Sequence, residues 1–217
     1  MKILAVDVGG TNVKILAAGE SEQRRFASGL TMTPKMMVQG VKDLARGWPY
    51  DVISLGYPGV VHDGQVASEP HNLAPGWIGF DYQAAFGCPV KLLNDAAMQA
   101  LGSYQKGLLL FVGLGTGLGS ALVNDKSVVP MELGHLSYRD GEFEDFVGAR
   151  GLARLGVQDW QQHVEFIVQR LIQVFHPDDV VLGGGNAKKL PKMPPGCRLG
   201  TNDHAFAGAF RMWEQSE

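Results

Sequence analysis

The chain has 217 residues, of which 45% are hydrophobic and 19% are charged, and its mean hydropathy is −0.02. These values are typical of a globular protein of one or two domains, and a net charge of −3 gives no basic surface for nucleic acid or for an anionic membrane. We find no apolar run long enough to cross a membrane and no signal peptide, and two cysteines are too few for a disulfide framework. We therefore expect a cytoplasmic protein without nucleic-acid or membrane partners.

Strands, glycine turns and helices alternate along the first half of the chain. Residues 3–6 and 13–18 are apolar runs on either side of a Gly-Gly pair, which predicts a β-hairpin. A helix is expected over 35–46, where apolar residues recur at helical spacing. The other elements predicted in this half are a strand at 52–57, a hairpin over 60–67, a loop over 70–80, a strand at 89–93 and a helix over 96–105.

The same order of elements begins again at residue 108. A strand at 108–112, a glycine-rich loop and a strand at 120–123 repeat the strand–glycine turn–strand unit of the first half, which suggests two related α/β domains with a cleft between them. We place the boundary near residues 95–107, with residues 1–97 and a closing helix within 204–217 in the first lobe, and residues 98–203 in the second. The remaining predictions are helices over 143–155, 159–175 and 205–213 and a strand at 180–182.

The segment Asp7-Val8-Gly9-Gly10-Thr11 follows the first predicted strand. Glycines let a backbone approach an anion closely, and successive N–H groups in such a turn can form a concave site for phosphate oxygens. The Thr11 hydroxyl can add a donor, and Asp7 can orient a Mg²⁺ ion, through water, that neutralises the charge of a phosphoryl donor. Taken alone, a hairpin turn capped by Asp7 explains the segment about equally well.

Four glycines alternate over residues 113–119. A dinucleotide-binding motif is excluded because Leu118 stands where its last glycine would be, and because a strand-like run follows in place of a helix. Alternating glycines weaken packing unless something approaches the backbone, so we interpret this loop, with Thr116 at its tip, as a second clamp on a phosphoryl donor. The triplet Gly183-Gly184-Gly185 could pass under a nucleotide base and ribose, although a strand-to-helix turn explains it about equally well.

Asn94-Asp95 stands where a predicted strand ends and a helix begins. Aspartate is a favoured helix N-cap, which would explain Asp95 without any function. The carboxyl ends of strands in α/β sheets also bind ligands, and a carboxylate there could accept the proton of a sugar hydroxyl during phosphoryl transfer. Glu132-Leu133-Gly134-His135 places a carboxylate and an imidazole three residues apart, where they could converge on a polyol or belong to a solvated loop.

Taken in order, these motifs resemble the ROK family of sugar kinases, within the actin-like ATPase superfamily, and in particular its polyphosphate/ATP glucokinase branch. The resemblance also includes Gly56-Tyr57-Pro58-Gly59-Val60-Val61 and Gly76-Trp77-Ile78-Gly79. It implies an α/β, two-lobed, ribonuclease H-like fold with a central cleft. It also implies transfer of a phosphoryl group from ATP or polyphosphate, with Mg²⁺, to a hexose, and the 6-hydroxyl of glucose is the first choice.

The resemblance implies roles for individual residues. Asp95 matches the catalytic base, and the alignment of Glu144 with a sugar-binding glutamate is loose because Glu142 is only two residues away. The residues expected to bind sugar are Asn72, Asn94, Asp95, Glu132, His135 and Glu144. The residues expected to bind the donor are Asp7, Gly9, Gly10, Thr11, Gly115, Thr116, Gly117 and Gly184, with Asp7 also expected to hold Mg²⁺.

The chain departs from the family pattern in two respects. Many ROK kinases carry a cysteine-rich zinc site after the Glu-x-Gly-His motif, whereas residues 136–150 contain no cysteine, so no zinc is expected. The chain is also short around 105–108 and 151–180, which leaves open whether ATP, polyphosphate or both serve as donor. Other acceptors (mannose, fructose or an N-acetylated amino sugar) and a sugar-binding or regulatory protein without turnover remain alternatives, and the family resemblance suggests a homodimer.

Overall fold

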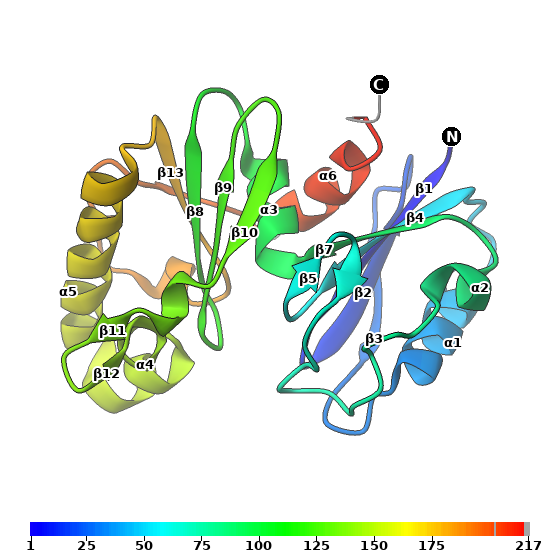
Figure 1. Ribbon diagram of the computed structural model, residues 1–217, viewed down its shortest axis with the longest axis horizontal. Coiled ribbons are helices and arrows are strands. Elements are labelled where there is room, and N and C mark those ends of the chain that lie inside the picture. The colour runs from blue at the N-terminus through cyan, green and yellow to red at the C-terminus, as the bar shows by residue number, and fades with distance from the viewer. Residues whose placement is uncertain (202, 215–217) are drawn as a thin grey trace. The chain divides into compact units, whose positions relative to one another are not determined.

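The computed structural model describes residues 1–201 and 203–214. The chain forms two compact units (Figure 1): unit 1 comprises Met1–Met98 and the chain from Ala205 on, and unit 2 comprises Gln99–His204. The chain passes from unit 1 to unit 2 within helix α3 (Asp95–Ser103) and returns at helix α6 (His204–Arg211). The closing helix expected within 204–217 therefore ends at Arg211, and residues 215–217 lie outside the described residues.

Unit 1 is built on a five-stranded sheet in the order β3-β2-β1-β4-β7. Strands β1, β2 and β3 are antiparallel, and β4 and β7 run parallel to β1. The first hairpin and the strand at 52–57 are confirmed, whereas β3 was not predicted because its side chains are only half buried or exposed. The strands are β1 (Ile3–Val8), β2 (Asn12–Ala17), β3 (Arg24–Ala27), β4 (Val52–Tyr57) and β7 (Val90–Asn94).

The sheet of unit 1 is covered on both faces. Leu4 and Val6 of β1 face a core that includes residues of α1 (Pro34–Leu44) and α2 (Tyr82–Phe86). Ala5 points to the opposite face, where it packs with Met98 of α3 and Phe206 of α6. Because successive residues of a strand point to opposite faces, helices on both sides explain why β1 is a continuous apolar run.

A small hairpin also belongs to unit 1, as predicted. Strands β5 (Val61–His62) and β6 (Gln65–Val66) are joined by Asp63 and Gly64, whose φ angles are 49° and 70°. Two successive residues with positive φ are the requirement of a type I′ hairpin turn, which Asp-Gly meets readily.

Unit 2 repeats the topology of unit 1 with a five-stranded sheet in the order β10-β9-β8-β13-β14. Strands β8, β9 and β10 are antiparallel, and β13 and β14 run parallel to β8. The strand–glycine turn–strand unit that the sequence repeats is therefore part of a larger repeat, in which the two sheets have the same strand order and the same strand directions. The strands are β8 (Leu109–Leu114), β9 (Leu118–Val123), β10 (Val128–Met131), β13 (Asp179–Gly183) and β14 (Arg198–Leu199).

The second glycine turn is shorter than predicted. Gly113 pairs with Gly119, and Leu114 pairs with Leu118, so only residues 115–117 are left between the strands. Leu114 and Leu118 both lie in the core of unit 2, and their burial explains why strand pairing continues into the glycine-rich segment.

Beyond the end of α3, unit 2 contains the helices α4 (Phe143–Val147) and α5 (Ala149–Phe175). The single helix predicted over 143–155 is wrong, because the chain is extended at Gly148, where a Cβ atom would lie 2.6 Å from the carbonyl oxygen of Thr116. Gly156, with a φ of 75°, interrupts α5 near the predicted gap. The short elements of this unit are η1 (Leu133–His135), β11 (Ser137–Tyr138), β12 (Gly141–Glu142) and η2 (Ala187–Lys189).

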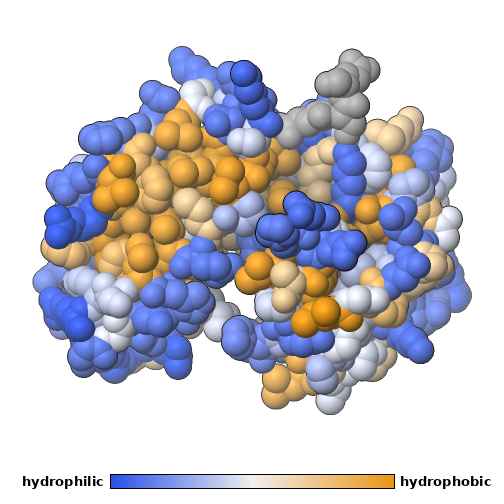
Figure 2. All heavy atoms as spheres, in the orientation of Figure 1, coloured by the Kyte–Doolittle hydropathy of each residue, from blue (hydrophilic) through white to orange (hydrophobic). Residues whose placement is uncertain are grey.

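Helix α5 packs against the sheet of unit 2 through Trp160, Val164 and Ile167, all fully or almost fully buried. Figure 2 shows hydrophobic residues gathered over the strands and α5 of this unit, with hydrophilic residues at its ends. Within residues 1–201 and 203–214, none of the helices combines the length and the apolar character that a bilayer crossing requires.

Candidate active site

The first glycine turn joins β1 to β2 and is braced by the protein itself. The backbone N–H of Gly9 donates to the carbonyl oxygen of Asn12 at 3.0 Å. Ser28 donates twice to the turn, from Oγ to the carbonyl oxygen of Gly9 at 2.5 Å and from its backbone N–H to that of Thr11 at 2.9 Å. These hydrogen bonds hold the backbone of the turn in one conformation before any ligand binds, so N–H groups of the turn that point outward would be preorganised for an anion. Ser28 was not predicted as a site residue.

Asp7 lies near the end of β1, directly opposite Lys14 of β2. The ammonium nitrogen of Lys14 is 3.4 Å from Oδ2 of Asp7, whose side chain is only 15% exposed. Burial raises the pKa of the Asp7 carboxyl above its usual value, and the positive charge of Lys14 opposes this rise only in part. Lys14 was missed in the sequence because its pairing with Asp7 follows from the hairpin register.

Asn72 lies against the first glycine turn. A Cβ atom on Gly10 would lie 2.9 Å from Cβ of Asn72, so the two residues can approach this closely only because Gly10 has no side chain. The structure thus brings together a residue predicted to bind the donor and a residue predicted to bind sugar.

The motif Gly76-Trp77-Ile78-Gly79 is held by the carboxylate of Glu69. This carboxylate accepts hydrogen bonds from the backbone N–H groups of Gly76, Trp77 and Ile78 at 3.0, 3.1 and 3.3 Å. Burial acts to raise the pKa of Glu69, but the three hydrogen bonds to its ionised form outweigh that effect and lower it. Glu69 therefore fixes the loop that follows Asn72.

Asn94 and Asp95 lie where β7 ends and α3 begins, as predicted. Oδ1 of Asn94 accepts a hydrogen bond from the backbone N–H of Ala97 at 3.1 Å, and Nδ2 donates to the carbonyl oxygen of Gly59 at 3.0 Å. Oδ1 of Asp95 accepts from the backbone N–H of the adjacent Ala96 at 2.7 Å. Asn94 therefore supplies a cap oxygen for α3, one residue before the Asp95 that the capping explanation named.

The ends of the parallel strands place these residues at one edge of the sheet in unit 1. The strand register aligns Asp7 of β1 with Gly56 of β4 and Leu93 of β7. Asp7 and the pair Asn94-Asp95 are thus two strand spacings apart, about 10 Å at the usual spacing. The carboxyl edge of such a sheet is where α/β proteins bind ligands.

The second glycine turn is braced in the same way as the first. The backbone N–H of Ala149, at the start of α5, lies 3.0 Å from the carbonyl oxygens of both Gly115 and Thr116. Nδ2 of Asn186 donates to the carbonyl oxygen of Gly115 at 2.9 Å, and the N–H of Gly115 donates to Gly117 at 3.2 Å. Asn186 is a further residue that the sequence did not reveal, although it directly follows the glycine triplet.

Gly184 has a structural reason to be glycine. Its φ is 79°, and a Cβ atom there would lie 2.5 Å from the carbonyl oxygen of Leu114. Its conformation and its contact therefore favour the turn explanation for the triplet, and binding of the donor by Gly184 stays a prediction.

The Glu132–His135 motif forms a compact group of charged side chains in unit 2. Nδ1 of His135 is 2.7 Å from Oε2 of Glu142, and Nε2 is 3.9 Å from Oε2 of Glu132. The hydrogen bond to the Glu142 carboxylate is the main cause that raises the pKa of His135 above its usual value. Partial burial opposes this rise, and the negative charges of Glu144, Glu142 and Glu132 add to it.

Glu144 lies between the second glycine turn and this motif. A Cβ atom on Gly117 would collide with Oε2 of Glu144, and one on Gly134 would lie 3.4 Å from the same oxygen. Donor atoms of His135, Glu142 and Glu144 all lie within 4.8 Å of one another, a spacing that could hold a metal ion. The predicted sugar ligand Glu144 therefore contacts a residue predicted to bind the donor.

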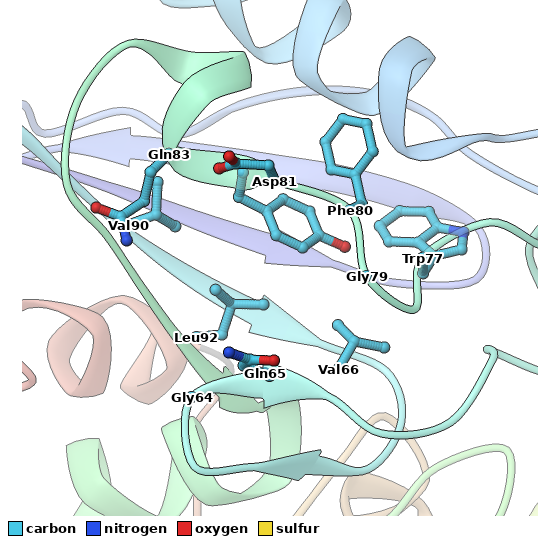
Figure 3. A pocket seen from close by; sticks show the side chains of 11 residues that line it. Gly64, Gln65, Val66, Trp77, Gly79, Phe80, Asp81, Gln83, Val90 and Leu92 are labelled. Carbon is cyan, nitrogen blue, oxygen red and sulfur yellow. The ribbon is translucent and has the colours of Figure 1, made fainter.

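Unit 1 also contains a cavity of about 280 Å³ beside the β5–β6 hairpin (Figure 3). Gln65 and Val66 of the hairpin, Trp77 and Tyr82 are among its lining residues, and it includes none of the predicted site residues. Within the described part of the chain, the Tyr82 hydroxyl is the buried side-chain polar atom that has no hydrogen-bond partner.

Comparison with known proteins agrees with the resemblance seen in the motifs. Polyphosphate glucokinase of Mycobacterium tuberculosis (strain CDC 1551 / Oshkosh) is 26% identical over an alignment of 212 positions, and the match covers 88% of this chain and 80% of that protein. Kanosamine kinase of Amycolatopsis mediterranei (strain S699) is 26% identical over an alignment of 253 positions, and the match covers 88% of this chain and 83% of that protein.

The crystal structure of inorganic polyphosphate/ATP-glucomannokinase from Arthrobacter sp. strain KM superimposes with a TM-score of 0.84 at 24% identity, covering 100% of this chain and 99% of that chain. This likeness confirms the predicted α/β fold of the actin-like class. The sequence profile of the ROK family matches residues 3–151, more than half of the 217 residues. The chain belongs to the ROK family.

Proposed function

We propose that this chain is a sugar kinase that transfers a phosphoryl group from ATP or polyphosphate to a hexose, with the 6-hydroxyl of glucose as the first choice. Membership of the ROK family and the kinases named above support the proposal. The observation that carries it is the position of Asp95 at the carboxyl edge of the sheet of unit 1, beside an asparagine that caps α3.

In the proposed reaction, the hydroxyl oxygen of the sugar forms a bond to the terminal phosphorus of the donor. The bond from that phosphorus to its bridging oxygen breaks, and Asp95 accepts the hydroxyl proton. The donor leaves as ADP or as a polyphosphate that is one unit shorter. Such a transfer requires little covalent chemistry from the protein, so positioning of the substrates and neutralisation of phosphate charge would provide most of the rate enhancement.

The two braced glycine turns would bind the donor through the hydroxyls of Thr11 and Thr116 and through backbone N–H groups other than those of Gly9 and Gly115, which donate within the turns. Asp7 would hold a Mg²⁺ ion, directly or through water, and the ion would neutralise phosphate charge. The carboxylate of Asp7 fits this role because burial disfavours its ionised form, which a divalent cation would stabilise. Lys14, which contacts Oδ2 of Asp7, would add a second positive charge beside the turn.

The sugar would be bound by the polar side chains of Asn72, Asn94, Glu132, His135 and Glu144. The amide nitrogen of Asn94 has two hydrogens, and since one is donated to Gly59, the other can be donated to a sugar hydroxyl. The similarity to a kanosamine kinase makes an amino sugar a specific alternative acceptor.

The test combines donors and acceptors. The purified protein is incubated with Mg²⁺ and either ATP or polyphosphate, and with glucose, mannose, fructose, N-acetylmannosamine or kanosamine, and the sugar phosphate is quantified. We expect product with glucose, and its loss both with a chelator and in Asp95→Asn. Glucose binding without product from either donor would instead indicate a sugar-binding protein without turnover. The proposal includes a cytoplasmic homodimer, and sedimentation of the purified protein tests the assembly.

A further inference from the structure

The hairpin that follows His135 brings a second glutamate back to this histidine. Strands β11 and β12 pair Ser137 with Glu142 and Tyr138 with Gly141. Arg139, in the two-residue turn between them, has a φ of 55°, which is uncommon outside glycine. A tight turn with this unusual conformation is what allows residue 142 to lie beside residue 135.

The backbone of Glu142 is fixed on both sides. Its N–H donates to Oδ2 of Asp145 at 3.0 Å, and the N–H of the next residue, Phe143, donates to the carbonyl oxygen of Leu136 at 2.9 Å. The Glu142 side chain therefore starts from a defined position next to His135, although 46% of it is exposed.

The contact between the two side chains determines which ring nitrogen of His135 donates to Glu142 and which one is left for another partner. An ionised carboxylate can only accept hydrogen bonds, so Nδ1 of His135, 2.7 Å from Oε2 of Glu142, must be the protonated donor. Nε2 then faces the side of Glu132, whose Oε2 is 3.9 Å away. A hydroxyl group at hydrogen-bond distance, about 2.8 Å, from both Nε2 and this oxygen would fit between them.

From this geometry we propose that Glu142 is a positioning residue for sugar binding: its carboxylate holds Nδ1 of His135 so that Nε2 is presented, together with Glu132, to a sugar hydroxyl. The inference rests on the proposed function, in which His135 and Glu132 contact the sugar. Glu142 itself touches the histidine and needs no contact with the sugar.

The charged groups around His135 make the proposal measurable. The carboxylates of Glu132, Glu142 and Glu144, from the segments before η1, in β12 and in α4, all favour the protonated ring, and Arg150 lies 4.0 Å from Glu144. Removal of the charge at Glu142 should lower the pKa of His135, because the hydrogen bond to Glu142 is the main cause of its rise.

The test uses Glu142→Ala and Glu142→Gln, with Asp140→Asn, an exposed acidic residue of the same hairpin, as the matched control. Sugar KM should rise by roughly three- to tenfold in Glu142→Ala, the range of one lost hydrogen bond, while donor KM stays unchanged. Glu142→Gln should recover part of the loss, since its amide oxygen can still accept from Nδ1. Nitrogen-15 NMR of the free protein should show a proton on Nδ1 of His135, and a lower titration midpoint in both variants.

The NMR measurement does not depend on turnover, so failure of the two proposals can be told apart. If neither donor gives product, but glucose binds to the wild type and binds more weakly to Glu142→Ala, the kinase proposal fails and the positioning role stands. The positioning role would be overturned if the Glu142 variants had the same sugar KM and the same titration midpoint of His135 as Asp140→Asn. So would a stoichiometric metal ion that is lost in Glu142→Ala, because Glu142 would then be a metal ligand.

Discussion

The side-chain oxygen of Asn94 accepts a hydrogen bond from the backbone N–H of Ala97 at 3.1 Å, and this bond caps helix α3. Asp95, the next residue along the chain, accepts a hydrogen bond from the backbone N–H of its neighbour Ala96 at 2.7 Å. In the proposed function these adjacent residues have different tasks, because Asn94 caps the helix and Asp95 accepts the proton of the sugar hydroxyl. Substitutions at the two positions should separate these tasks.

Asp95→Asn should lower kcat by about 10²- to 10⁴-fold, the usual contribution of a general base. Its stability should change little, because asparagine keeps an oxygen that can accept from the backbone N–H of Ala96. A coupled kinetic assay and a thermal melt of the same preparation provide the two measurements. Turnover within twofold of wild type would rule out Asp95 as the base.

Asn94→Ala should lower the free energy of unfolding by about 0.5–2 kcal/mol, because the cap of α3 is lost. Asn94→Asp keeps the cap oxygen and loses only the donor to Gly59, so it should be the milder change. Urea denaturation of both variants gives the comparison. An equal loss in both would mean that the bond to Gly59, and not the cap, provides the stability.

Alanine substitutions in the second glycine turn should distinguish donor binding from packing. Nothing lies within 4 Å of a Cβ atom at Gly115, so Gly115→Ala should leave the melting temperature unchanged. If phosphates approach this backbone, donor KM should rise roughly tenfold, equivalent to about 1.4 kcal/mol. Unchanged donor KM would show that the donor does not approach Gly115.

Gly117→Ala is the matched comparison. Its Cβ would collide with the carboxylate of Glu144, which stands at the end of a flexible side chain and can move away. We therefore expect a raised sugar KM with little loss of stability, because Glu144 is proposed to bind sugar. Initial rates at varied sugar concentration test this, and an effect on donor KM alone would contradict the role given to Glu144.

Asp7→Asn should remove activity without lowering stability at neutral pH. Burial places the folded-state pKa of Asp7 above the ordinary value of 3.8, so its stabilising contribution is present below that value and is lost as pH rises through the folded-state pKa. Asparagine does not ionise, so the free energy of unfolding should fall less with rising pH in the variant than in the wild type. Unfolding measured from acid to neutral pH tests the sign. A variant less stable than wild type at pH 7 would mean that the pair with Lys14 outweighs the cost of burial.

Local sequence patterns were sufficient for the elements whose signals are local. Apolar runs beside Gly-Gly predicted the β1–β2 hairpin, and Asp63-Gly64 predicted the β5–β6 turn. The lengths of β8 and β9 were not predictable, because glycines at alternate positions suggest a loop until the burial of Leu114 and Leu118 is known. Helix α4 was predicted too long for a similar reason, since the contact of Gly148 with the second turn is a tertiary one.

The sequence by itself determined the family, the repeated α/β plan and the motifs that contain the candidate site residues, because these depend on residue order alone. Only the tertiary structure decided which partner each of these residues has. Lys14 meets Asp7 through a strand register, and Asn186 reaches Gly115 across many residues of chain. The same is true of Glu142, which reaches His135 through a hairpin turn. Partners of this kind are set by packing and backbone direction, which no short segment specifies.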